Sequence, residues 1–265
     1  MRYLDGPRPR LFAHRGASGV APENTLAAFR AAVDAGADRL ELDVHATADG
    51  HVVVSHDATV DRTTDSSGPI QSLRLADLVR LDAGFRFVGP GGDHPFRLRG
   101  ERIPTLAELL EAFPDIPLNI EVKQEDPPIV REVLDVLDRF DARGRVLLAA
   151  EGDPIMARIR EAAPDILTGF TANEVITFLQ QGREPGYRPP GAALQVPPSY
   201  FGISIVTADT VARAHALGVE VHVWTINDEA EMDSLLDLGV DALMSDFPSR
   251  AMDVLRRRGE RASRA

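Results

Sequence analysis

Short apolar runs alternate with longer amphipathic stretches along almost the whole chain, and this alternation restricts the possible folds more than any other feature. The apolar runs, which read as buried strands, are Leu11–His14, Arg39–His45, Leu118–Lys123, Val146–Ala150, Ile166–Phe170, Ala193–Val196, Val219–Thr225 and Ala242–Ser245. The amphipathic stretches, which read as helices, are Asn24–Ala35, Leu106–Phe113, Ile129–Phe140, Pro154–Ala163, Ala172–Gln181, Ala208–Leu217, Asp228–Leu238 and Ser249–Arg257. Strands that alternate with helices form parallel sheets. Eight such units in 265 residues predict an α/β fold, a (β/α)8 TIM barrel.

One strand-like segment, Val52–Asp57, interrupts the alternation. It follows Arg39–His45 too closely for a parallel crossover, so we expect the two segments to pair antiparallel. Asp49-Gly50 reads as a two-residue hairpin loop, and that loop places His56 opposite Asp43. Residues 58–104 are then a small insertion after the second barrel strand. Since no flexible linker divides the chain, we expect residues 1–265 to be a single barrel domain.

The charge balance narrows the classes of partner and location. With 29 Lys and Arg against 41 Asp and Glu, the net charge is −12, so we expect no binding to nucleic acid. The basic run Arg256–Arg258 with Arg261 reads as a solvated helix end. No Cys is present, no apolar run is long enough for a membrane span, and the first residues do not resemble a secretory signal. We therefore expect a cytoplasmic protein without a stable membrane anchor; its oligomeric state is open.

Acidic residues occupy strand ends, where a barrel usually carries its active site. Glu41 and Asp43 are two residues apart, so both project from one face of their strand, and Glu121 and Lys123 repeat this pattern on the next strand. Three converging carboxylates repel one another, and a hard dication such as Mg²⁺ or Ca²⁺ is the simplest remedy. The alternative is a buried salt bridge to Lys123, which neutralises one carboxylate and leaves two.

Histidine and basic residues accompany the acids at the same strand ends. His14 and His56 are the candidate proton carriers, since imidazole titrates near neutral pH. Arg15 and Lys123 provide positive charge suited to a phosphoryl oxyanion, and Trp224 is a candidate substrate platform. The sequence contains no nucleotide-binding glycine motif and no Gly-x-Ser-x-Gly.

These residues occur in motifs that resemble those of the glycerophosphodiester phosphodiesterase family. In chain order the motifs are His14-Arg15-Gly16-Ala17, Pro22-Glu23-Asn24-Thr25, Glu41-Leu42-Asp43-Val44, Ser55-His56-Asp57, Ile103-Pro104-Thr105-Leu106, Ile120-Glu121-Val122-Lys123, Trp224-Thr225-Ile226-Asn227 and Ser245-Asp246-Phe247-Pro248. Each motif alone is weak, whereas their common order and spacing are specific. One departure is Ala150-Glu151, where many members carry Ser-Phe.

The resemblance implies a barrel enzyme that hydrolyses small glycerophosphodiesters to sn-glycerol 3-phosphate and an alcohol. It implies that His14 and His56 are the general acid and base, and that Glu41, Asp43 and Glu121 bind the divalent metal. It assigns the phosphate to Arg15 and Lys123. The nucleophile is either water or the neighbouring glycerol 2-hydroxyl. Two alternative functions are a lysophospholipase D, with a groove near Phe85–Val88 and Phe96, and a non-catalytic glycerophosphodiester-binding protein.

Overall fold

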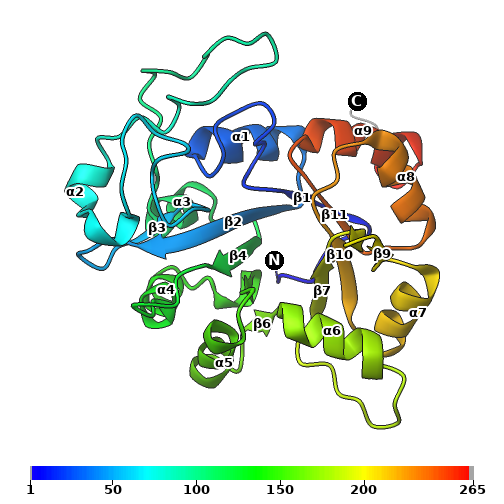
Figure 1. Cartoon of the computed structure of the whole chain (residues 1–265). Helices are drawn as coiled ribbons and strands as arrows, with labels where there is room; N and C mark the ends of the chain where they lie inside the picture. The colour runs from blue at the N-terminus through cyan, green and yellow to red at the C-terminus, as the bar shows by residue number, and fades with distance from the viewer. Residues whose placement is uncertain (1, 263–265) are drawn as a thin grey trace.

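The computed structural model describes residues 2–262, and within them eight parallel strands form a nearly closed barrel (Figure 1). In order around the sheet the strands are β6 (Leu167–Thr168), β5 (Val146–Ala149), β4 (Leu118–Val122), β2 (Arg39–Ala46), β1 (Arg10–Ala13), β11 (Ala242–Ser245), β10 (Glu220–Val223) and β7 (Ala193–Val196). A parallel bridge between Gly169 and Ala193 joins the ends of this order. The predicted TIM barrel is confirmed, although several strands are shorter than the sequence indicates.

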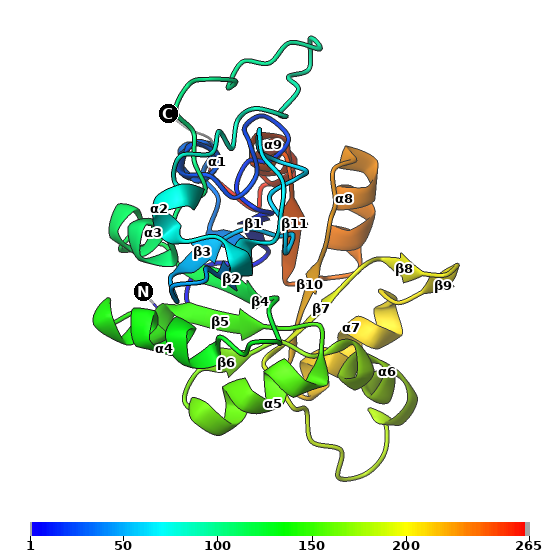
Figure 2. The ribbon, with the colours of Figure 1, turned by 60° about the vertical axis from the view of Figure 1, so that its left-hand side comes forward.

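Helices surround the barrel and cover the outer face of its strands (Figures 1 and 2). They are α1 (Leu26–Ala35), α3 (Leu106–Ala112), α4 (Val130–Arg139), α5 (Asp153–Ala162), α6 (Ala172–Gln181), α7 (Ala208–Ala216), α8 (Glu229–Asp237) and α9 (Pro248–Arg257), with a 3-10 turn η2 at Arg143–Arg145. Leu40, Leu42 and Val44 of β2 belong to the buried cluster that these helices cover. Because side chains alternate along a strand, Glu41 and Asp43 face the barrel interior.

Helix α3 begins as the sequence predicts. The Thr105 hydroxyl accepts a hydrogen bond from the Glu108 N–H, and the Glu108 carboxylate accepts one from the Thr105 N–H. This reciprocal pair satisfies two backbone donors that a helix start otherwise leaves unpaired.

The hairpin after β2 has a different register from the predicted one. Val44 pairs with Val54 of β3 (Val52–Val54), so that Asp43 lies opposite Ser55 and the predicted pairing of Asp43 with His56 is wrong. The loop has three residues instead of two. Gly50 has φ +80°, and its N–H donates to the Thr47 carbonyl, which closes the turn. His56 lies beyond the end of β3 and reaches the barrel mouth through irregular chain.

The segment between β3 and α3 contains a short 3-10 turn η1 (Ile70–Ser72) and the one-turn helix α2 (Leu75–Leu78). A small apolar cluster holds it against β3, and its members are Val53, Val60, Ile70, Leu78, Ala83 and Ile103. A second excursion, the hairpin of β8 (Ser199–Tyr200) and β9 (Ile203–Ser204), projects from the barrel near α7 and α8 (Figure 2). None of the helices in residues 2–262 is long and apolar enough to span a bilayer.

Candidate active site

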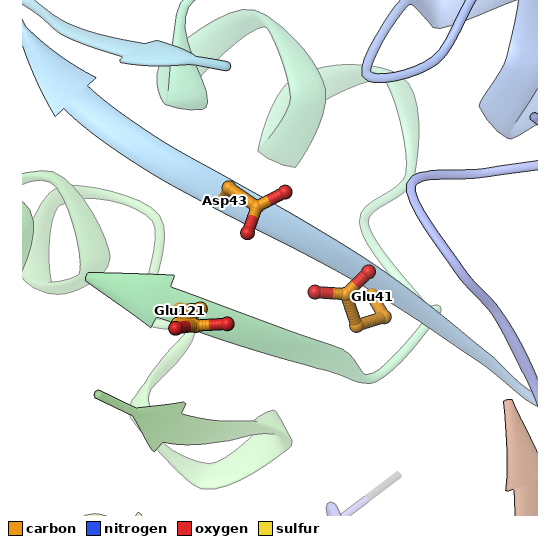
Figure 3. Close-up of side chains that lie close together, drawn as sticks. All are labelled: Glu41, Asp43 and Glu121. Atoms are coloured by element: carbon orange, nitrogen blue, oxygen red, sulfur yellow. The ribbon is translucent and has the colours of Figure 1, made fainter. Parts of the chain in front are cut away.

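Three carboxylates converge inside the barrel mouth. Glu41 and Asp43 come from β2 and Glu121 from β4, and Figure 3 shows their carboxylates turned toward a common space. The two strands pair in parallel with Asp43 beside Glu121. One oxygen from each residue lies within 4.8 Å of the other two. The structure therefore brings together the three acids that the sequence grouped.

Burial makes this cluster electrostatically costly. Burial and the neighbouring Asp43 raise the pKa of Glu41 to about 7. Burial likewise raises the pKa of Glu121, against the opposing effect of Lys123. Protein groups alone thus leave Glu41 only partly ionised near neutral pH. Additional positive charge would stabilise the ionised form of the cluster.

Two basic side chains already lie against the acids. Lys123 Nζ is 2.8 Å from Glu121 Oε1 and 3.3 Å from Asp43 Oδ1, while Arg15 Nε is 3.5 Å from Asp43 Oδ2. Burial works to lower the pKa of Lys123, but Glu121 and Asp43 outweigh burial and raise it, so the amine stays protonated. The salt bridge considered from the sequence is therefore present, and it shares one positive charge between two carboxylates.

The loop after β1 holds Arg15 by an unusual backbone conformation. Arg15 has φ +53°, and its backbone N–H donates to Glu41 Oε2 at 2.9 Å. Gly16, at φ +82°, follows it, and a Cβ on Gly16 would lie only 2.7 Å from the backbone of Ala28 in α1. Left-handed backbone at a non-glycine residue is sparsely populated and often marks functional sites. Here it aims a main-chain donor at the acidic cluster.

His14 follows β1 and is held by a carboxylate at the end of the adjacent strand β11. Its Nδ1 lies 2.7 Å from Asp246 Oδ1. Asp246 also accepts hydrogen bonds from Ser18 Oγ and Asn227 Nδ2. Burial works to lower the pKa of His14, but the Asp246 hydrogen bond and the charge of Glu41 outweigh burial, and the pKa is raised. With Nδ1 engaged by Asp246, Nε2 is the ring nitrogen left for proton transfer.

His56 is held in the same way, by the carboxylate of the residue that follows it. Its Nδ1 lies 2.7 Å from Asp57 Oδ1. About one third of the His56 side chain is exposed, more than for His14. Its charge acts on Glu121, whereas that of His14 acts on Glu41. The two imidazoles therefore lie near different members of the acidic cluster.

Trp224 lies just past the carboxyl end of β10, and 41% of its surface is exposed. The adjacent Thr225 Oγ1 is 3.5 Å from His14 Nδ1, which puts the Trp224 backbone near the site.

Glu151, the departure after β5 from the family pattern, is exposed. The buried His222 bonds to Glu220 deeper in the barrel and takes no part in the cluster.

Two site residues have no definite role from the sequence alone. Asn24 opens the first predicted helix, where both a part in the site and a helix cap fit the sequence; the cap of α1 is Thr25, and Asn24 Nδ2 donates to Asp43 Oδ2 at 3.1 Å. The Asn24 Oδ1 is buried and has no hydrogen-bond partner among the described residues. Asp246 was noted at its strand end but given no role; a closed barrel places the last strand beside the first, and this adjacency was the available signal.

A family model decides the relationship. The model described as "Glycerophosphoryl diester phosphodiesterase family" matches residues 14–250, which include every residue of the site described above. The chain belongs to the glycerophosphoryl diester phosphodiesterase family. Membership confirms the resemblance read from the motifs and makes the protein an enzyme, a glycerophosphodiester hydrolase.

Individual relatives of the family agree over nearly the full chain. A glycerophosphodiester phosphodiesterase of Caldanaerobacter subterraneus subsp. tengcongensis is 32% identical, covering 94% of this chain and 98% of that protein. A mouse lysophospholipase D is 28% identical, covering 93% of this chain and 86% of that protein. The structure of an Oleispira antarctica phosphodiesterase, in complex with the product sn-glycerol-3-phosphate, superposes with a TM-score of 0.77 at 30% identity, covering 94% and 97% of the two chains.

Proposed function

We propose that the protein hydrolyses glycerophosphodiesters at the cluster of Glu41, Asp43 and Glu121, with a divalent metal and two histidines. We further propose that residues 1–265 act as one barrel domain in which residues 58–104 are an insertion. The observation that carries the proposal is the convergence of three carboxylates between two imidazoles that are each paired with a carboxylate. Such a set combines charge neutralisation with proton transfer, which are the two requirements of phosphodiester cleavage.

The residues present fit a hard dication. Glu41, Asp43 and Glu121 offer only oxygen donors, as Mg²⁺ and Ca²⁺ prefer, and the cluster carries more negative charge than Arg15 and Lys123 offset. When bound, the metal would polarise a phosphoryl oxygen as a Lewis acid. Titration of the protein with each ion would distinguish Mg²⁺ from Ca²⁺ as the bound metal.

The basic and aromatic residues would bind the substrate. Arg15 and Lys123 would hold the phosphate oxygens, Arg15 through its planar fork and Lys123 as a point charge. Their contacts with Asp43 keep both positive groups at the mouth before substrate arrives. Trp224, partly exposed on the rim, would cover the glycerol or alcohol portion.

His14 and His56 would carry the protons. One imidazole removes the proton of the nucleophile, and the other protonates the departing alcohol oxygen. Because each Nδ1 is bonded to a carboxylate, the transfers would take place at Nε2. The products are sn-glycerol 3-phosphate, which matches the product bound in the Oleispira structure, and the free alcohol.

Asp246→Asn tests the assignment of His14. Without the carboxylate charge, burial acts on the imidazole with less opposition, so the pKa of His14 falls. The limb of the pH profile of kcat/KM that reports His14 should move to lower pH, and kcat should fall by about 10–100-fold because the ring is less firmly oriented. Steady-state rates measured from pH 5 to 9 show both effects. Ser18→Ala removes a neutral contact to Asp246 and should leave the limb in place; an unmoved limb in Asp246→Asn contradicts the pairing.

Phosphorus NMR tests the function as a whole. Glycerophosphocholine incubated with the protein and Mg²⁺ or Ca²⁺ should give sn-glycerol 3-phosphate and choline. Binding of glycerophosphocholine without product would favour the non-catalytic alternative. A panel of other headgroups then determines the alcohol preference.

A second candidate substrate, a lysophospholipid, is favoured by the exposed apolar hairpin. Tyr200, Phe201 and Ile203 are 62%, 89% and 68% exposed, and the hairpin follows β7 at the same barrel end as the acids. The groove expected in the insertion is less suitable, since Phe87 and Phe96 pack on each other with ring centroids 5.4 Å apart. The mouse relative is named a lysophospholipase D.

Phe201→Ser separates the two substrates. If the hairpin contacts acyl chains, the variant should lower kcat/KM on lysophosphatidylcholine micelles by about 3–10-fold, the value of losing one partly buried aromatic contact. The rate on glycerophosphocholine should not change. Ile176→Ser, an exposed apolar residue of α6 outside both the hairpin and the insertion, is the matched control. Equal losses of kcat/KM on micelles in both variants would mean that the hairpin does not contact the acyl chains.

A further inference from the structure

Among the described residues of the insertion, Arg62 is the one whose side-chain ion pairs join two separate parts of the barrel mouth. It lies five residues after Asp57, and its Nε donates to Asp57 Oδ2 at 2.6 Å. Its two terminal nitrogens bind both oxygens of Glu23, at 2.6 and 2.8 Å. All three donor groups of the guanidinium thus have carboxylate partners. Glu23 lies on the loop before α1, and the insertion runs beside this helix in both views (Figures 1 and 2).

Each carboxylate that Arg62 holds also contacts a residue of the proposed machinery. The other oxygen of Asp57 is 2.7 Å from His56 Nδ1. Glu23 Oε1 accepts a hydrogen bond from Arg15 Nη1 at 3.1 Å. Basic and acidic side chains therefore alternate along one continuous chain from His56 through Asp57, Arg62 and Glu23 to Arg15. Arg62 is the centre of this chain and the only member that reaches both sides.

The charges indicate how strongly the two carboxylates depend on Arg62. Burial works to raise the pKa of Glu23, but the hydrogen bonds from Arg62 and the charge of Arg15 outweigh it and lower the pKa. Burial also opposes ionisation of Asp57, yet Arg62 and His56 hold its pKa at about 2. A planar fork with three charged contacts fixes geometry far better than a single exposed ion pair, which contributes little.

We propose that Arg62 is a positioning residue that spans Glu23 and Asp57 and so holds phosphate-binding Arg15 and proton-carrying His56 at a fixed separation across the mouth. The proposal rests on the proposed function of those two residues. Without Arg62, Asp57 is free to turn away from the His56 imidazole. Arg15 is then the remaining basic partner of Glu23, and Glu23 pulls the Arg15 guanidinium away from Asp43. The insertion then has a role in catalysis as the carrier of this clamp.

Arg62→Met tests the proposal, because it keeps an unbranched, largely apolar stem and removes the guanidinium fork. We expect kcat to fall by about 10–100-fold, the scale of a misplacement near 1 Å, while KM changes less. Arg62→Lys keeps the charge but cannot make three contacts, so it should recover part of the loss. The matched control is Arg102→Met, which removes another two-pronged arginine–carboxylate pair of the insertion, with Glu108, outside the mouth. That variant should keep kcat within about twofold of the unmodified protein.

A second measurement does not depend on activity. Nitrogen-15 NMR should show shifted signals for the His56 imidazole and the Arg15 Nε–H in Arg62→Met, and unshifted ones in Arg102→Met; thermal unfolding of both variants reports folding. Failure of the unmodified protein to cleave any glycerophosphodiester would count against the proposed function, and the NMR shifts would still decide the clamp. Wild-type kcat in Arg62→Met, or a lost kcat with unshifted His56 and Arg15 signals, overturns the proposal.

Discussion

His14→Ala and His56→Ala should each lower kcat by about 10²–10⁴, because each removes a proposed proton carrier from the transition state. Each imidazole is anchored by a carboxylate, at 2.7 Å in both cases, so alanine removes a pre-oriented group whose place water does not fill with the same geometry. KM should change much less, since binding of the phosphate is assigned to Arg15 and Lys123. Steady-state kinetics on glycerophosphocholine with saturating metal measures both parameters.

The control for the histidine variants is His51→Ala, an exposed imidazole on the β2–β3 hairpin. It should leave kcat unchanged. The double variant of His14 and His56 should lose less than the product of the single losses, since residues that act as a unit are not additive. Unchanged turnover in either single variant removes that histidine from the mechanism.

Chelation by EDTA should reduce turnover to background, and Mg²⁺ or Ca²⁺ should restore it, because Arg15 and Lys123 alone leave the acidic cluster with excess negative charge. Glu121→Gln, which removes the most exposed of the three proposed ligands, should weaken metal binding without the folding cost of altering buried Asp43. Full activity after exhaustive chelation contradicts the metal assignment.

The same site predicts how metal binding depends on pH. The pKa of Glu41 in the folded protein, about 7, lies above its ordinary value, so the folded state holds this proton more tightly than the unfolded state. Ionising Glu41 therefore costs stability as pH rises from about 4.5 to 7, and a bound dication removes that cost. Below pH 7 the metal must displace the proton, and its affinity should fall by about tenfold per pH unit.

Thermal unfolding measures this linkage. A metal concentration about 100 times Kd should raise Tm by about 5–10 °C at pH 8, and the same concentration should raise it much less at pH 5.5. Glu41→Gln, which cannot ionise, should lose this pH dependence. An equal shift of Tm at both pH values would mean that Glu41 is not a ligand.

The barrel and the grouping of its acids could be predicted because both depend on short-range rules. The alternation of apolar and amphipathic segments fixes parallel strands, and the two-residue spacing of Glu41 and Asp43 fixes a common face. Glu121 joined them because consecutive parallel strands usually pair, and the structure pairs Asp43 with Glu121 directly.

The hairpin register could not be predicted from these short-range rules. Asp49-Gly50 suits a two-residue loop, and the folded chain uses three residues with Gly50 as the left-handed one. The difference of one residue removes His56 from the ladder position expected for it. Loop conformations of this kind differ by small free energies that strand packing decides, because a slip of one residue turns every side chain to the other face.

The sequence by itself determined the barrel, the inward direction of its acids and the family, since periodicity and motif spacing are local properties of the chain. Only the tertiary structure decided which charged groups meet. Asp246 contacts His14 across 232 positions, and Arg62 contacts Glu23 across 39. A charge pattern along a chain does not specify its partners, because Coulomb attraction depends on separation in space, and barrel closure and loop geometry set that separation.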